Sequence, residues 1–347
     1  MVAFRTGTVG EVLSERRGLQ RVTVDGERAY VLSDLLGPVA PGDRVVVNTT
    51  AVDLGLGTGG WHVVHWNLSR AALAEPGPGH VMKLRYTSLQ HDAGTYEEHD
   101  RRPDDAGGGL DGLPVVVTGL HSLVAPVVAA IRGLRPASRI AYVMTDDAAL
   151  PLALSDLVAQ LTAGGLIDVT ITAGQAFGGD REAVNVASAL WGARHRFGAD
   201  VAVVAMGPGN VGTGTELGHA ALGQVPAIDL AAELGGRVVV GLRAGAADAR
   251  DRHRGLSHHS ATVLRLARGP AAVAVPSAWS ELLRAELGRI EPFRHEIVEV
   301  EAPEVLHRLT GAGIELRSMG RPAADDPCFV DTAAAAGAVA ASALGTR

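Results

Sequence analysis

Glycines recur at a spacing that suits anion binding in residues 207–215, which read Gly-Pro-Gly-Asn-Val-Gly-Thr-Gly-Thr. Gly207, Gly209 and Gly212 form a G-x-G-x-x-G pattern after an apolar run, and such glycines let backbone N–H groups approach a phosphate or carboxylate. The loop would add polar contacts from three side chains, those of Asn210, Thr213 and Thr215. We therefore expect an anion-binding loop, with one of the two threonines capping a helix that follows it.

A second polar stretch runs from Arg252 to Ser260 and contains adjacent histidines. His258 and His259 are candidates for acid/base chemistry, and Arg252 and Arg254 are candidates for anion binding. A solvated basic loop fits the same residues. The stretch has no H-x-x-x-H or C-x-x-C spacing, so we expect no stoichiometric metal, and no cofactor is indicated.

His121 and Asp180 are further acid/base candidates because each follows an expected strand. Ser122 lacks the flanking glycines of a nucleophile elbow and is better explained as a helix N-cap. Asp229 has the spacing of the acidic residue in a dinucleotide site, but its surroundings favour a helix rather than a strand end. A serine hydrolase and a nicotinamide or flavin protein are therefore weaker hypotheses than a general anion site.

The elements that position these residues are strands that read as continuous apolar runs. Such runs predict strands covered on both faces, as in a parallel sheet with helices on each side. The expected strands are 114–118, 139–144, 167–172, 200–206, 237–242, 271–275 and 296–300, and an Ala-rich helix begins near Asp331. Ligands of open parallel sheets bind beyond the carboxyl ends of the strands, where the candidate residues gather.

The first hundred residues follow another pattern, with short alternating strands near 8–12, 20–24, 28–32, 44–48 and 61–66. Asp25-Gly26 between two of these runs is a strong hairpin signal. Together they predict a small β-barrel-like module that serves as a scaffold or docking unit. We expect a β-rich module at 1–100, a linker at 101–112 and a parallel α/β domain at 113–347, with limited proteolysis cutting first in the linker.

The composition of the chain limits the classes of partner that we expect it to bind. The 347 residues carry a formal net charge of −7, which disfavours binding to nucleic acid or to a membrane surface. The early residues lack a continuous apolar segment, and the single cysteine fits a reducing compartment. We expect a cytoplasmic protein whose partner is a small anionic ligand, and we leave homo-oligomerisation open.

Four segments, 82–90, 177–185, 207–215 and 248–260, together resemble a bacterial family of uncharacterised proteins, and the resemblance runs over most of the chain. It implies no activity, substrate or cofactor. The residues themselves favour an enzyme or binding protein for a small phosphorylated or carboxylated metabolite, with its site at the carboxyl rim of the sheet. A non-enzymatic scaffold and a metal-dependent hydrolase are the alternatives.

Overall fold

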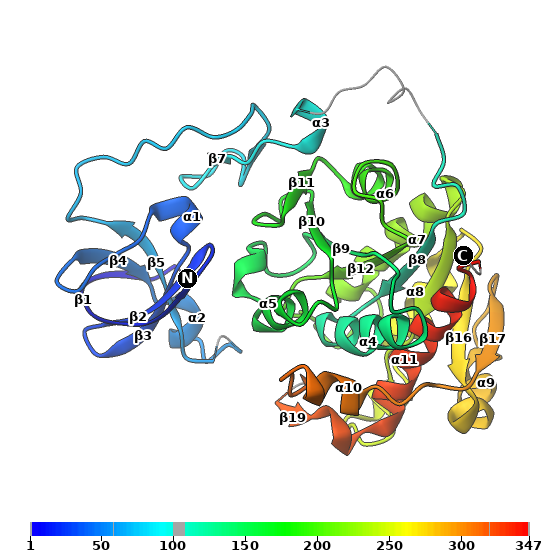
Figure 1. Cartoon of the computed structure of the whole chain (residues 1–347). Helices are drawn as coiled ribbons and strands as arrows, with labels where there is room; N and C mark the ends of the chain where they lie inside the picture. The colour runs from blue at the N-terminus through cyan, green and yellow to red at the C-terminus, as the bar shows by residue number, and fades with distance from the viewer. Residues whose placement is uncertain (1, 58, 100–107, 319, 346–347) are drawn as a thin grey trace. The chain divides into compact units, whose positions relative to one another are not determined.

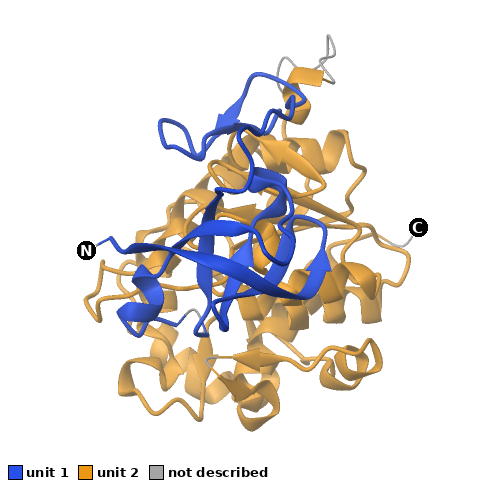
Figure 2. Cartoon of the chain, turned by 90° about the vertical axis from the view of Figure 1, so that its left-hand side faces the viewer, with its two compact units in different colours: residues 1–94 blue, residues 95–347 orange. Residues whose placement is uncertain are grey.

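A computed structural model describes the chain except for residues 1, 58, 100–107, 319 and 346–347 (Figure 1). It divides into two compact units, Met1–Gly94 and Thr95–Arg347, which Figure 2 shows in separate colours. Most of the linker predicted at 101–112 lies outside the described residues.

The first unit is a closed barrel with the strand order β1-β2-β3-β5-β4. Its strands are β1 (Phe4–Arg16), β2 (Leu19–Val24), β3 (Glu27–Val31), β4 (Arg44–Asn48) and β5 (His62–Asn67). Asp25 and Gly26 join β2 to β3 with φ values of 50° and 83°, as the primed hairpin turns require. Alternate residues such as Val22 and Val45 fill the barrel interior. The unit also contains the helices α1 (Ser33–Leu36) and α2 (Thr50–Asp53) and the strand pair β6 (Met82–Lys83) and β7 (His91–Asp92).

The second unit is built on an eight-stranded, wholly parallel sheet, so the α/β prediction is confirmed. The order across the sheet is β11-β10-β9-β12-β8-β13-β16-β17. Along the chain, the strands are β8 (Pro114–Thr118), β9 (Ile140–Thr145), β10 (Val169–Ala173), β11 (Arg181–Ala183), β12 (Val201–Met206), β13 (Arg237–Gly241), β16 (Ala272–Pro276) and β17 (Glu296–Val300).

Helices cover both faces of this sheet, because apolar side chains of each strand point alternately to the two sides. Val116 packs into one core with the helices α4 (Val124–Leu134), α5 (Asp156–Ala163), α10 (Leu306–Gly311) and α11 (Pro327–Ser342). Val115 and Val117 pack into the other core with the helices α6 (Val186–His195), α7 (Gln224–Glu233), α8 (His258–Leu266) and α9 (Ser280–Leu287). A short helix, α3 (Tyr96–His99), precedes the sheet.

The connections change direction between two neighbouring strands of the sheet. From β8 the chain crosses to β9 through α4 on one face, whereas from β12 it crosses to β13 through α7 on the other face. Such a switch point leaves a crevice outside the carboxyl ends of the two strands, where ligands of open α/β sheets bind. The Gly-rich loop follows β12 and therefore borders this crevice.

Two local features differ from the sequence-based expectation. Residues Arg181–Ala183, expected in a loop, form the edge strand β11, which pairs with β10. No helix follows Thr215 directly, because the chain first returns through a hairpin to the 3₁₀ helix η3 (Ala220–Gly223) and then enters α7 at Gln224. Among the described residues, none of the helices has both the length and the apolar character needed to cross a membrane.

Candidate functional site

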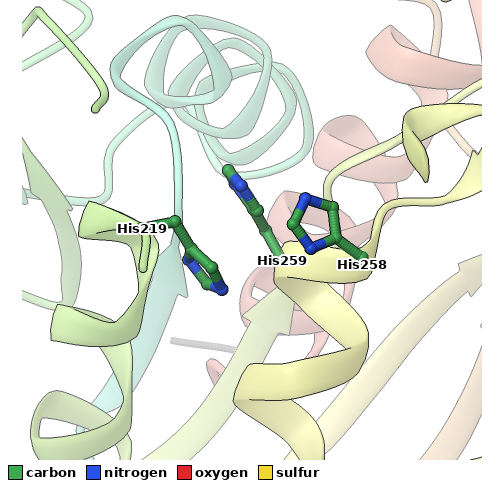
Figure 3. A group of neighbouring side chains, drawn as sticks. All are labelled: His219, His258 and His259. Carbon is green, nitrogen blue, oxygen red and sulfur yellow. The ribbon is translucent and has the colours of Figure 1, made fainter. Parts of the chain in front are cut away.

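Two segments bring three histidines together beyond the carboxyl ends of β12 and β13. His219 precedes η3, and His258 and His259 are the first two residues of α8 (Figure 3). One ring nitrogen from each histidine lies within 4.8 Å of the others. The His219 and His259 rings stack with centroids 3.9 Å apart. A fourth ring, that of His253, lies 5.0 Å from those of both His258 and His259. We call these four residues the histidine cluster.

Ser257 fixes the start of α8 and thereby the position of two of these rings. Its hydroxyl oxygen accepts a hydrogen bond from the backbone N–H of His259 at 3.3 Å, as an N-cap residue does. The same oxygen lies 2.7 Å from Nδ1 of His253. Because α8 begins here, the positive end of its dipole faces the cluster.

Arg243 lies at the centre of the site, two residues beyond the end of β13. Its backbone N–H donates to the hydroxyl of Ser260, and its Nη1 donates to Nδ1 of His259 at 3.0 Å. The side chain is only 6% exposed, and within the described part of the chain no carboxylate forms an ion pair with it. The nearby Asp248 is held by Arg250 through two side-chain hydrogen bonds of 2.9 and 3.0 Å. Burial lowers the pKa of Arg243 to about 10.

Burial and neighbouring positive charge keep the histidines neutral. Burial is the main cause that lowers the pKa of His253 to about 3 and that of His259 to about 2, and the charge of Arg243 acts in the same direction. The pKa values of His219 and His258 are lowered, again chiefly by burial, although a backbone group of Glu216 partly offsets this for His219. At neutral pH each ring therefore offers one N–H donor and one lone pair.

The hydrogen bond from Arg243 also fixes the tautomer of His259. A guanidinium group can only donate, so Nδ1 of His259 accepts and the ring hydrogen lies on Nε2. That Nε2 atom lies 3.7 Å from the position that a Cβ atom on Gly212 would occupy. The Gly-rich loop and the 252–259 segment therefore meet at His259.

The Gly-rich loop is a hairpin and not the start of a helix. Gly212 pairs with His219 across it, and the backbone N–H of Thr213 donates to the carbonyl of Gly218 at 2.8 Å. Thr213 and Thr215 join their hydroxyls at 2.9 Å within the hairpin, so the expectation that one of them caps a helix is wrong. An ion pair of 2.5 Å between Glu216 and Arg265 ties the hairpin to α8.

Glycine is needed within this loop because Gly209 has a φ of 97°, in the left-handed region that other residues avoid. The side-chain oxygen of the next residue, Asn210, is buried and has no hydrogen-bond partner in the described structure. Arg252 borders the loop, since its Nη1 lies 3.9 Å from where a Cβ atom on Gly214 would be. Arg254 instead pairs with the exposed Asp251 at 3.3 Å.

The two remaining candidates make other contacts. Nε2 of His121 lies 2.6 Å from the hydroxyl of Ser155, and its Nδ1 lies 3.2 Å from the carbonyl of Met206. Asp180 accepts hydrogen bonds from the backbone and the hydroxyl of Thr170, near the start of β10. Three strands separate β10 from β13, a distance of about 19 Å at the usual strand spacing. The structure thus does not bring Asp180 to the histidine cluster.

A small cavity of about 30 Å³ lies beside Arg243, and its walls also include His253, Arg321 and the three carboxylates of Asp248, Asp325 and Asp326. A larger cavity of about 620 Å³ lies at the opposite, amino end of the strands, where Pro114 and Arg237 begin β8 and β13. There the guanidinium of Arg237 donates to the carbonyl of Ala343, near the end of the chain. Charged side chains line both cavities, and the smaller one borders the histidine cluster through His253.

Sequence reasoning missed three members of the site: His219, Arg243 and His253. His219 lies 39 positions before His258, so no short spacing motif could contain both. For Arg243 the sequence offers its place directly after the apolar run Val238 to Leu242, at the carboxyl end of an expected strand, although its burial appears only in the fold.

The fold and the cluster define a parallel α/β protein with a barrel unit and a histidine–arginine centre at the carboxyl end of its sheet. The family described as "Protein of unknown function (DUF3866)" matches residues 28–337. The chain belongs to this family, which confirms the resemblance to a family of uncharacterised proteins. Comparisons with the curated proteins and with the solved structures found no match.

Proposed function

We propose that the protein binds, and acts as an enzyme on, a small phosphorylated or carboxylated metabolite in the site around Arg243. The observation that carries this proposal is the burial of the Arg243 guanidinium without an acidic partner in the described structure. A buried charge is costly unless an opposite charge and hydrogen bonds compensate it. A bound anion would supply both.

Two sets of donors lie near this position. Arg243 offers several N–H groups, and Nε2–H of His259 faces the Gly-rich hairpin. Arg252 borders the same hairpin, and the dipole of α8 adds partial positive charge. The cavity of about 30 Å³ is lined by the carboxylates of Asp248, Asp325 and Asp326 as well as by Arg321, so we place the anion on the side of Arg243 that faces the histidine cluster and not in this cavity.

The histidines give the site its chemistry in this proposal. His258 and His259 are neutral, so each could take up or release a proton close to the bound group. The anion would offset the charge of Arg243 and so raise the pKa values of both rings, while burial, the main cause of the lowering, would remain. The neutral rings would then act as hydrogen-bond partners and proton acceptors for the bound ligand.

Calorimetric titration with sulfate, phosphate and small dicarboxylates tests the proposal. We expect binding by the full chain and its loss in Arg243→Met, whereas Arg254→Met, whose arginine pairs with Asp251 at the surface, should bind nearly as well. A chain that binds none of these anions would instead favour a scaffold role.

The net charge of −7 supports the further inference that nucleic acid is not the partner, and the single cysteine, Cys328, supports a cytoplasmic location. A metal-dependent hydrolase is the second candidate, because three of the histidines group their ring nitrogens within 4.8 Å.

A further inference from the structure

We propose that His219, His258 and His259 bind one divalent transition-metal ion, and that an anion at Arg243 strengthens this binding. The metal site stands on the histidines alone, and a bound ion would use the lone pairs of His258 and His259, so their acid/base role belongs to the metal-free protein. Its coupling to an anion rests on the proposed function.

Unpartnered ring nitrogens point to the metal. Both nitrogens of His219 and Nε2 of His258 are buried and make no hydrogen bond of normal geometry within the described structure, and the backbone of Glu216 is the one group that interacts weakly with His219. The His219 side chain is only 6% exposed, so water does not readily satisfy it. Buried polar atoms in native proteins are nearly always paired, and several unpaired ones in one place indicate a missing ligand.

The type of ligand atom selects the type of ion. Three imidazoles without a carboxylate favour Zn²⁺, Co²⁺, Ni²⁺ or Cu²⁺ over Mg²⁺ or Ca²⁺. Ligand nitrogens of a tetrahedral zinc ion are about 3.3 Å apart, and here the three lie within 4.8 Å of one another. His219 and His259 stack with an angle of only 12° between their planes, so one ring must turn to aim its nitrogen at the ion. Three protein ligands leave a fourth position for a water or for an oxygen of the anion.

Arg243 connects this site to the anion. Because its Nη1 donates to Nδ1 of His259, the lone pair at Nε2 of that ring is replaced by a hydrogen. Coordination through Nε2 needs the other tautomer, which cannot form while Arg243 holds Nδ1, and coordination through Nδ1 needs that same bond broken. An anion that draws the guanidinium away frees His259 in either case. The two ligands therefore favour each other, and their opposite charges add to the effect.

The probe is Co²⁺, whose visible absorption reports coordination by nitrogen, added to full-length protein treated with a chelator. We expect one equivalent to bind, and sulfate to lower its apparent Kd at least fivefold. His219→Gln should weaken Co²⁺ binding by more than thirtyfold. The matched control is His253→Asn, which removes a ring of the same cluster but keeps an amide where Nδ1 faces Ser257, and it should bind Co²⁺ as wild type does.

Arg243→Met tests the coupling. In this variant we expect Co²⁺ to bind without sulfate at least as tightly as it binds wild type with sulfate, and sulfate to have no effect. If His219→Gln fails to fold, as circular dichroism would reveal, His258→Gln replaces it, because His258 is less buried.

Two results would overturn the metal site. One is no Co²⁺ bound at micromolar concentrations with or without sulfate. The other is unchanged Co²⁺ binding in His219→Gln, or in His258→Gln where that variant replaces it. Co²⁺ binding that ignores sulfate would overturn the coupling. Calorimetry with sulfate on the metal-free protein separates these failures from failure of the proposed function, since anion binding through Arg243 needs no metal.

Discussion

Two polar clusters lie beyond the carboxyl ends of the same sheet, and they differ in how completely their hydrogen bonds are satisfied. Around His121 every group is paired: Nδ1 donates to the carbonyl of Met206, Nε2 accepts from the hydroxyl of Ser155, and that hydroxyl accepts from the backbone of Val158. Around Arg243 the buried guanidinium donates to a neutral histidine, His259. Nearby ring nitrogens of His219 and His258 make no hydrogen bond of normal geometry in the described structure.

The completeness of the hydrogen bonding distinguishes a structural cluster from a candidate binding site better than residue type does. Both clusters contain buried histidines with lowered pKa values, so a perturbed pKa alone would select both. The first cluster already contains everything that it needs and ties α5 to the sheet. In the proposed function, a bound anion completes the second cluster. The predictions below test this contrast.

The largest effect should come from Arg243→Met. Removal of the guanidinium should weaken anion binding at least a hundredfold, about 2.7 kcal/mol, measured by calorimetry. The unfolding temperature without ligand should stay the same or rise, because a methionine replaces an uncompensated buried charge. A large fall in stability with unchanged affinity would mean that Arg243 is a structural residue like His121.

Acid should destabilise the protein partly through His121. Burial lowers its pKa from 6.5 to about 4, so the unfolded chain takes up the proton first as the pH falls through this window. The contribution is complete above pH 6.5, and roughly 1 to 2 kcal/mol of it is lost at pH 5. Urea unfolding at pH 7 and pH 5 measures the loss. It should be smaller in His121→Leu, and an equal loss in both proteins would assign the acid sensitivity to other groups.

Gly209→Val should weaken anion binding about tenfold, about 1.4 kcal/mol, through strain at a φ of 97° that shifts the hairpin. No atom lies within 4 Å of the added Cβ position, so the fold should survive. Calorimetry with sulfate is the measurement, and Gly235→Val, at a left-handed glycine in the turn after α7, is the control. Equal affinity in both variants would show that the hairpin does not contact the anion.

The smallest effect should come from Ser155→Ala in the first cluster. Loss of the α5 cap and of the partner of His121 should cost about 1 kcal/mol of unfolding free energy, measured in urea. Anion affinity should not change. A change in affinity would contradict the view that the two clusters act independently.

The sequence predicts the sheet well because strands buried on both faces are continuous apolar runs, such as Val201 to Met206. The barrel is equally predictable, because apolar and polar residues alternate along its strands and Asp25-Gly26 marks a hairpin. These signals are local, because each strand pattern or turn lies within one short stretch of sequence.

The site is less predictable because its members meet only after folding. His219 reaches His259 through a hairpin whose pairing no glycine pattern specifies. Asp180 was expected at the rim because the short edge strand β11 resembles a loop, yet its carboxylate binds Thr170 near the other end of β10. The burial of Arg243 depends on packing from both sides, which its neighbours in sequence do not reveal.

The ion pair between Glu216 and Arg265 should affect how fast a ligand enters and leaves the site. It joins the tip of the hairpin to α8, and both side chains are in contact with solvent, at 63% and 35% exposure. Salt weakens such a pair by screening, so the hairpin should detach from α8 more often as ionic strength rises. Ligand exchange would then accelerate in both directions, and the residence time of a bound anion would shorten even where its equilibrium affinity changes little.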